Sequence, residues 1–213
     1  MNHFVKQLAV IMARGESRRM GQSKGLCRLG NQDDPFVLQI AKTYSQCGLP
    51  VLLIVRPEDE ADYSKVLAGV SVEILAAPGG GDTAQTMSLA LDWARARGLA
   101  PHWFWAHPVD MPLVSEKTIN DLWTAASAAP ANAWRPAYEG TPGHPVLMPG
   151  NLLSRLLEKD PAGKSMSEIW KAAVARALVS PMQLLKVDDD GVITDYDTPD
   201  QLKTAAEKKE PGS

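Results

Sequence analysis

Short apolar runs alternate with helical patterns through the first half of the chain, and this alternation constrains the fold most strongly. Four apolar runs occur, at residues 8–12, 51–55, 72–75 and 103–106. Apolar residues at helical spacing lie between them, at 35–44 and 83–97. Nearly continuous apolar runs are typical of parallel strands, because helices cover both faces of such a sheet. The alternation predicts a single Rossmann-like α/β domain with a mostly parallel sheet and right-handed crossovers.

The second half is less regular. We expect Ser115 to cap a helix that ends near Ala129. Prolines and glycines between 136 and 150 predict turns and short strands. Two more helices are expected, near residues 152–159 and 165–178.

The end of the chain predicts a hairpin followed by a helix. Residues 182–187 have the pattern of a strand, and Asp188 to Gly191 that of a turn into residues 192–194. Pro199 is expected to open the last helix. We expect the domain to span residues 1–206 and residues 207–213 to form a frayed, charged tail.

Composition narrows the class of protein. The 213 residues are 45% hydrophobic and 22% charged, which suits a globular domain with a sizeable core. A net charge of −3 argues against a protein that coats nucleic acid, although local phosphate sites remain compatible with it. Cys27 and Cys47 have neither metal spacing nor the pattern of a disulfide framework. The apolar run at 8–13 is too short for a secretory signal or a membrane span, so we expect a cytoplasmic protein.

A loop rich in glycine and basic residues follows the first strand. It reads Met12-Ala13-Arg14-Gly15-Glu16-Ser17-Arg18-Arg19-Met20-Gly21-Gln22-Ser23-Lys24. Ligands of open α/β sheets bind where such loops leave the strands. Glycines let backbone N–H groups approach phosphate oxygens, and basic side chains add charge there. The plain alternative is a solvated basic loop, since the segment is neither a Walker loop nor a dinucleotide fingerprint.

Asp110 follows the fourth apolar run, in His107-Pro108-Val109-Asp110-Met111-Pro112. Its carboxylate is therefore expected at the same sheet edge as the basic loop. Magnesium is held by one or two carboxylates together with phosphate oxygens and waters, so Asp110 is a candidate ligand. Taken alone, this segment is better explained by an aspartate in a turn.

Three further segments carry weaker signals. Asp195 and Asp197 would point the same way in an extended chain, before a helix start at Thr198-Pro199. His144 lies in a turn of glycines and prolines and could contact a ligand or simply bond to backbone. Asp82, after three glycines, predicts a capped helix start.

Taken in order, these motifs resemble the nucleotidyltransferases of molybdenum-cofactor biosynthesis, above all the molybdenum cofactor cytidylyltransferases and their MobA-like relatives. That family opens with Leu-Ala-Ala-Gly-x-Ser-x-Arg-Met-Gly-x-x-Lys. The matching residues here are Ala13, Gly15, Ser17, Arg19, Met20, Gly21 and Lys24. Residues 109–114, 143–146 and 195–199 match the later motifs, and the resemblance spans residues 7–203.

The resemblance implies a nucleotide-diphospho-sugar transferase type of fold and a magnesium-dependent reaction. A nucleoside monophosphate would pass from an NTP, with CTP favoured, to the terminal phosphate of molybdenum-bound molybdopterin, releasing pyrophosphate. A molybdenum hydroxylase is the candidate recipient of the product. Residues implied in nucleotide binding are Met12, Ala13, Arg14, Gly15, Arg19, Lys24 and Gly81. Lys24, Arg19 and Asp110 would be catalytic, His144 would bind the acceptor, and the metal ligands would come from Asp110, Asp197 and Asp195.

Arg14 is the main departure from the family pattern, which has Ala or Gly at this position near the nucleobase. Arginine is long, always charged and rich in donors, so we expect Arg14 to alter the choice of base. Two rival functions remain. One is a sugar-phosphate or alcohol-phosphate nucleotidyltransferase, and the other is a non-catalytic chaperone for the pterin cofactor.

Overall fold

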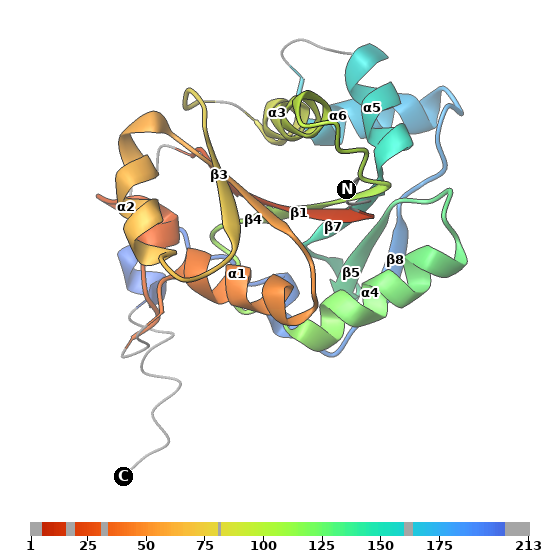
Figure 1. Cartoon of the computed structure of the whole chain (residues 1–213). Helices are drawn as coiled ribbons and strands as arrows, with labels where there is room; N and C mark the ends of the chain where they lie inside the picture. Colours follow the sequence, from red (N-terminus) through yellow and green to blue (C-terminus); the bar gives the residue numbers. More distant parts are fainter. Residues whose placement is uncertain (1–5, 16–19, 31–33, 81, 160–163, 203–213) are drawn as a thin grey trace.

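A mixed β-sheet forms the middle layer of the molecule, with helices on both faces (Figure 1). The computed structural model describes residues 6–15, 20–30, 34–80, 82–159 and 164–202. The strands in these residues are β1 Gln7–Ala13, β2 Val51–Val55, β3 Val72–Ala76, β4 Trp103–Pro108, β5 Trp134–Tyr138, β6 Thr141–Pro142, β7 Val146–Pro149 and β8 Gln183–Lys186. The α-helices are α1 Phe36–Gln46, α2 Glu60–Val66, α3 Thr83–Ala96, α4 Glu116–Ala128, α5 Gly150–Lys159 and α6 Met166–Ala175. Three 3-10 helices are η1 Lys24–Leu26, η2 Pro57–Asp59 and η3 Asp190–Val192.

The strand order is β3-β2-β1-β4-β7-β5-β6, with β8 paired to β5. Strands β1 to β4 are parallel, which confirms the four strands expected from the apolar runs. β7 runs antiparallel to β4, and β8 is parallel to β5. The α/β class is therefore confirmed, with a sheet that is parallel in its first half and mixed in its second.

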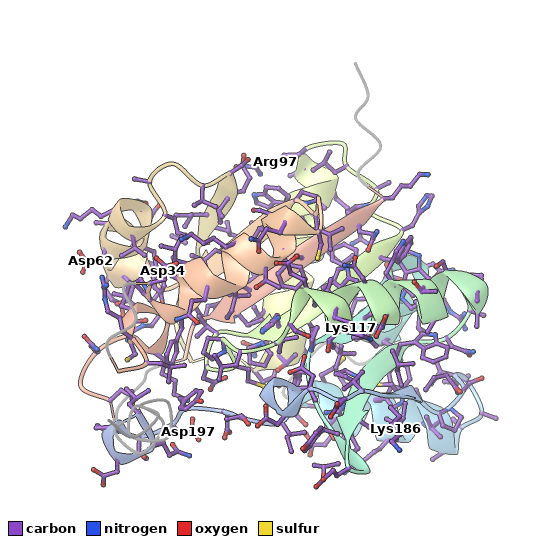
Figure 2. All side chains as sticks on the ribbon, turned by 90° about the horizontal axis from the view of Figure 1, so that it is seen from below. Asp34, Asp62, Arg97, Lys117, Lys186 and Asp197 are labelled. Atoms are coloured by element: carbon purple, nitrogen blue, oxygen red, sulfur yellow. The ribbon has the colours of Figure 1, made fainter. Side chains whose placement is uncertain are left out.

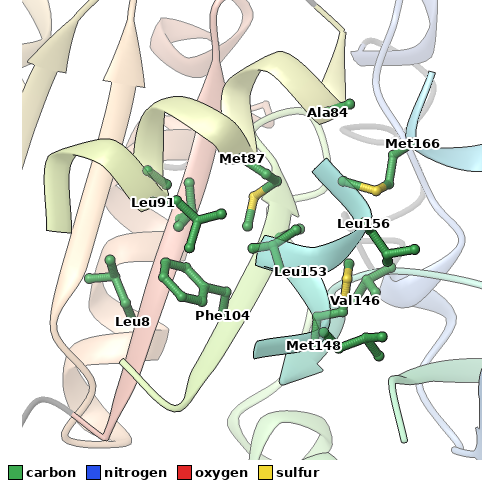
Figure 3. Close-up of a cluster of buried hydrophobic side chains, with 14 of the residues drawn as sticks. Leu8, Ala84, Met87, Leu91, Phe104, Val146, Met148, Leu153, Leu156 and Met166 are labelled. Carbon is green, nitrogen blue, oxygen red and sulfur yellow. The ribbon is translucent and has the colours of Figure 1, made fainter. Parts of the chain in front are cut away.

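Alternate residues of β1 enter two separate cores, one on each face of the sheet. Leu8 and Val10 pack with α3, α5 and α6, whereas Ala9 and Ile11 pack with α1 and α4. Figure 3 shows Met87 of α3 and Leu153 of α5 beside Phe104 of β4 in the first of these cores. Burying one such side chain contributes about 1.5–3 kcal/mol, so both faces of the central strands hold the layers together.

Side-chain caps fix the starts of three helices. Asp82 accepts a hydrogen bond of 2.9 Å from Gln85 N at α3, and Ser115 Oγ accepts one of 3.2 Å from Thr118 N at α4. Ser165 and Glu168 form a reciprocal capping box at α6. Such caps are worth about 1 kcal/mol each, and the two that the sequence predicted are confirmed.

The predicted hairpin over residues 182–194 is wrong in its second half. β8 forms, but the chain then enters η3 instead of a returning strand. Asp189 explains the difference, because its carboxylate accepts hydrogen bonds from Gly191 N at 3.1 Å and from Ser115 Oγ at 2.7 Å. The acidic stretch therefore ties this segment to the start of α4 and caps η3.

The last helix begins at Pro199, as expected, and is described to residue 202. Gln201 N donates to Thr198 Oγ1 at 3.4 Å, in keeping with the expected cap. The tail at 207–213 lies outside the described residues. None of the helices in the described ranges is long and apolar enough to cross a membrane. Cys27 and Cys47 are both free thiols.

Candidate active site

Three motifs far apart in the sequence meet at the carboxyl ends of β1 and β4. Met12 of β1 pairs with Pro108 of β4, so the loops that follow both strands leave the sheet side by side. Lys24 lies at the end of the loop that follows β1, and Asp110 lies just after β4. The Lys24 ammonium lies 2.8 Å from Asp110 Oδ2 and also forms an ion pair with Asp197. The structure therefore brings together the basic loop, the aspartate after β4 and the C-terminal acidic motif.

Lys24 is a cation held by two carboxylates. Burial disfavours its charge, but the hydrogen bonds and charges of Asp110 and Asp197 outweigh burial and raise its pKa. The three groups together carry a net charge of −1, because two carboxylates face one ammonium. The two carboxylates stabilise the positive charge of Lys24, and the remaining negative charge can attract one more cation.

The turn that carries Asp110 is fixed by a buried histidine. Met111 O accepts a bond of 2.9 Å from His107 Nε2, so the Tyr44 hydroxyl, 2.9 Å from Nδ1, donates to that atom. Burial lowers the pKa of His107 to about 4, against the opposing effect of the bond to Met111. A neutral imidazole with both nitrogens bonded thus connects α1 to the Asp110 turn.

The C-terminal motif approaches Asp110 through its backbone as well. Tyr196 N donates to Asp110 O at 3.0 Å. Gln201 Oε1 accepts from Asp197 N at 2.7 Å and so orients the residue that contacts Lys24. Figure 2 shows Asp197 well apart from Lys186 at the end of β8, so the segment between them crosses this side of the molecule.

Asp195 and Asp197 contact different parts of this region. Asp197 pairs with Lys24, whereas Asp195 lines a cavity of about 400 Å³ together with Asp110 and His144. The sequence predicted that both carboxylates point the same way and left open which of them binds the metal. In the structure, Asp197 is the member of the pair that shares a cation with Asp110.

Arg14 is buried against the connection between β3 and α3, with 6% of its surface exposed. Its Nε donates to Pro78 O at 2.9 Å, its Nη2 donates to the same oxygen, and its Nη1 donates to Thr86 Oγ1 at 3.2 Å. Burial lowers its pKa, and the charge of Asp82 acts in the opposite direction. The guanidinium thus joins the end of β1 to the first turn of α3.

The other predicted nucleotide-binding residues lie at or beyond the end of β1. Met12 and Ala13 are its last two residues, and Gly15 follows them at the surface. Arg19 and Gly81, both predicted to bind nucleotide, lie outside the described residues.

A second cavity, of about 670 Å³, adjoins the first. Both are lined by Arg135, Pro142 and His144, and the larger one continues over α6 to Trp170 and Met166. The Gly-His-Pro motif shapes this junction because it interrupts the strand between β6 and β7. Gly143 is required there, since a Cβ would lie 2.1 Å from Val192 O.

His144 sits at the junction as a neutral side chain. Burial and then the charge of Arg135 lower its pKa to about 4, although the Ala106 carbonyl and Asp110 act in the opposite direction. Its Nδ1 is buried and has no hydrogen-bond partner in the described parts of the chain. A buried nitrogen without a partner is uncommon in native structures and is compatible with a ligand contact.

Comparison with known proteins identifies the family. The family model of the MobA-like NTP transferase domain matches residues 9–177. The chain belongs to this family. Membership makes it a transferase of the nucleotidyl-transfer class, and the resemblance predicted from the motifs is confirmed. No curated protein matches the sequence.

Solved structures of this type share the fold at low identity. Rv0371c of Mycobacterium tuberculosis has a TM-score of 0.73 at 20% identity, over 96% of this chain and 98% of that one. A nucleotidyl transferase of Methanothermobacter has a TM-score of 0.75 at 14% identity, over 95% and 96%. A manganese complex of Rv0371c has a TM-score of 0.68 at 17% identity, over 96% and 99%.

The residues present fit a magnesium ion that also binds substrate. In the described ranges, no group of three or more His, Cys, Asp or Glu side chains could enclose a metal. Magnesium does not need such a cage, because one or two carboxylates, phosphate oxygens and waters complete its shell. Asp110 and Asp197, which both form ion pairs with Lys24, would supply the carboxylates of such a shell.

Sequence reasoning missed Arg135, His107 and Tyr44. The only signal for Arg135 was one charge inside a short strand, Trp134–Tyr138, in a stretch where prolines suggested turns. Tyr44 and His107 are 63 residues apart, so their hydrogen bond could not be inferred from one sequence.

Proposed function

We propose that this member of the MobA-like family is a magnesium-dependent cytidylyltransferase of molybdenum-cofactor biosynthesis. It would transfer CMP from CTP to the terminal phosphate of molybdenum-bound molybdopterin and release pyrophosphate. The observation that supports this most directly is the convergence of Lys24, Asp110 and Asp197 at the end of β1 and β4. A molybdenum hydroxylase as recipient and a cytoplasmic location are part of the same proposal.

On the nucleotide side, the end of β1 and its loop would hold the triphosphate. Backbone groups from Met12 to Gly15, together with Gly81, would approach the base and phosphates. Arg19 and Lys24 would supply positive charge to the phosphates. Arg14 would influence the choice of base, since its guanidinium fixes the β3–α3 connection beside this loop.

Asp110 and Asp197 would hold the magnesium ion, with Asp195 nearby. When bound, the ion would neutralise negative charge on the phosphates as pyrophosphate leaves. The aspartates would orient the ion, and His107 would keep the Asp110 turn in place through Met111.

The acceptor would lie on the other side of Asp110. The segment from Gly140 to Pro149 shapes the junction of the two cavities, and His144 would contact the acceptor there. A phosphate is already a nucleophile, so the enzyme needs no general base. Its task is to position the two phosphates in line and to stabilise developing charge.

Pyrophosphate release with CTP, GTP, ATP and UTP tests this proposal. Each NTP is incubated with magnesium and with molybdenum cofactor, without an acceptor, or with a sugar phosphate or an alcohol phosphate. The proposal predicts release that requires molybdenum cofactor and is fastest with CTP. Release with a sugar or alcohol phosphate alone would favour the rival transferase, and no release with any pair would favour the chaperone.

A further inference from the structure

Arg135 lies where the two cavities meet. It belongs to β5, and its Nε donates to Gly143 O at 2.9 Å. This bond uses the Nε–H group of the guanidinium, and Nη1 and Nη2 can make other contacts. Arg135 lines both cavities, so its side chain borders the space that a ligand would fill.

No carboxylate in the described ranges compensates the charge of Arg135. Among the residues that the structure describes, its one hydrogen-bond partner is the Gly143 carbonyl, and no acidic side chain forms an ion pair with it. Burial lowers the pKa of Arg135, and no neighbouring charge is a cause of the shift. A partly desolvated guanidinium without an anion is costly, and a bound anion would offset that cost.

The two cavities differ in chemistry on either side of Arg135. Among the described residues, the larger one is lined by Lys171 but by no carboxylate, and its walls include Trp170, Met166 and Met182. Figure 3 shows Val146 and Met148, which also line this cavity, next to each other. The smaller cavity contains Asp110 and Asp195. A volume of about 670 Å³ lies within the range typical of small-molecule sites.

We propose that Arg135 binds the phosphate of the acceptor, with the apolar or aromatic body of that acceptor in the larger cavity. This inference rests on the proposed transfer reaction and names the residue that selects its acceptor. The guanidinium can bond two phosphate oxygens at once, which fixes orientation as well as position. Arg135 and Asp110 line the same smaller cavity. A phosphate bound to Arg135 would therefore lie on the side of the site where Asp110 is proposed to hold the metal ion and the nucleotide.

The competing explanation is structural. Arg135 could serve only to hold Gly143 and thereby the turn that contains His144. Two variants separate these roles. Arg135→Gln has an amide nitrogen at the position of Nε and can still donate to Gly143 O, but it removes the cation. Arg135→Lys has a methylene at that position and loses this bond, but it retains a cation at the cavity wall.

Phenyl phosphate is the probe, because it joins an aromatic ring to one phosphate. Calorimetric titration compares phenyl phosphate, inorganic phosphate and phenol on the whole chain, with melting curves for each variant. We expect Arg135→Gln to weaken phenyl phosphate about 10- to 100-fold, as for loss of hydrogen bonds to a charged group, and to leave phenol unchanged. Arg135→Lys should recover part of the affinity, and inorganic phosphate should bind more weakly than phenyl phosphate.

Lys24→Ala is the matched control, because it removes a cation from the nucleotide side. Phenyl phosphate should bind this variant nearly as tightly as wild type. Equal affinity in wild type and Arg135→Gln would overturn the proposal. So would equal losses in Arg135→Gln and Arg135→Lys, or a loss confined to Lys24→Ala.

The titration needs no NTP, so its failure is distinct from failure of the transfer reaction. Suppose that binding of phenyl phosphate depends on Arg135 but that molybdenum cofactor supports no pyrophosphate release. The anion site at Arg135 is then supported, and the proposed acceptor is wrong. If release occurs and Arg135→Gln leaves the KM for the acceptor unchanged, the reaction stands and the role of Arg135 is overturned. Support for both is a raised acceptor KM with an unchanged KM for CTP.

Discussion

The Lys24 ammonium lies 2.8 Å from Asp110 Oδ2, although 86 residues separate the two in the sequence. The parallel pairing of β1 with β4 accounts for this contact, because it aligns the loops that carry both residues. Asp197, a further 87 residues along the chain, joins the same ammonium. Each motif alone was compatible with a simple turn or helix start, and their convergence is what supports a catalytic role.

Lys24→Ala should lower turnover roughly 10²- to 10³-fold, because it removes a positive charge from the reacting phosphates. Pyrophosphate release at saturating NTP measures the effect. Its partners Asp110 and Asp197 are partly exposed, so the variant should still fold. Lys24→Arg, which keeps the charge, should retain more activity than Lys24→Ala, and wild-type turnover in Lys24→Ala would show that Lys24 has another role.

Asp110→Asn and Asp197→Asn should each lose magnesium-dependent turnover while keeping their fold. Both changes preserve shape and remove a charge from the site assigned to the metal. Asp195→Asn is the matched control, because Asp195 does not pair with Lys24 in this structure. Titration of magnesium in the pyrophosphate assay measures the apparent metal affinity. An effect in Asp195→Asn larger than in Asp197→Asn would reverse the assignment of the two.

Arg14→Ala should raise the preference for CTP over GTP, because it restores the small residue of the family. It should also destabilise the fold by about 1–3 kcal/mol, since buried bonds to Pro78 and Thr86 are lost. Calorimetry gives the ratio of the two affinities, and thermal melting gives the stability. Thr86→Val is the control: it removes the bond from Arg14 Nη1 and the bond of 3.0 Å from Thr86 Oγ1 to Asp82 O, but it keeps the Arg14 guanidinium. Identical CTP-to-GTP ratios in wild type and Arg14→Ala would show that Arg14 does not act on the base.

Stability should fall on acidification because His107 is buried and neutral. Its pKa is near 6.5 in the unfolded chain and about 4 in the folded one. Between these values the unfolded state binds a proton that the folded state does not, so lower pH favours unfolding. The loss by pH 4 is about 3 kcal/mol. Denaturant unfolding of wild type and His107→Gln from pH 7 to pH 4 measures it. In His107→Gln, the free energy of unfolding should fall less steeply with decreasing pH than in wild type. Some pH dependence should remain, because the pKa of His144 is lowered as well. Equal slopes in the two proteins would contradict the prediction.

The first half of the fold was predictable because its strands are buried on both faces. A strand that is buried on both faces needs apolar residues throughout, and Leu8 to Met12 and Val51 to Val55 are continuous apolar runs of this kind. The helical patterns between the runs then indicate an α/β fold. The second half was harder, because long-range side-chain bonds decide it. The Asp189 carboxylate accepts four hydrogen bonds, and these favour η3 over the predicted hairpin. Three of them come from residues near the start of α4, so the local sequence does not predict them.

The candidate site was predictable only through its motifs in order. Lys24, Asp110 and Asp197 were expected at one sheet edge, and the structure places them in contact. Arg135 was missed because its importance comes from a missing carboxylate partner and from two adjoining cavities. Neither property is visible in a sequence, since both depend on which distant residues fold around a side chain.

A crystal structure with magnesium and a non-hydrolysable CTP analogue would locate both the metal ion and the nucleotide. We expect a metal ion within direct or one-water reach of both Asp110 and Asp197, with the Lys24 ammonium moved onto the phosphates. An ion that neither aspartate reaches, or a nucleotide bound away from the loop after β1, would contradict it.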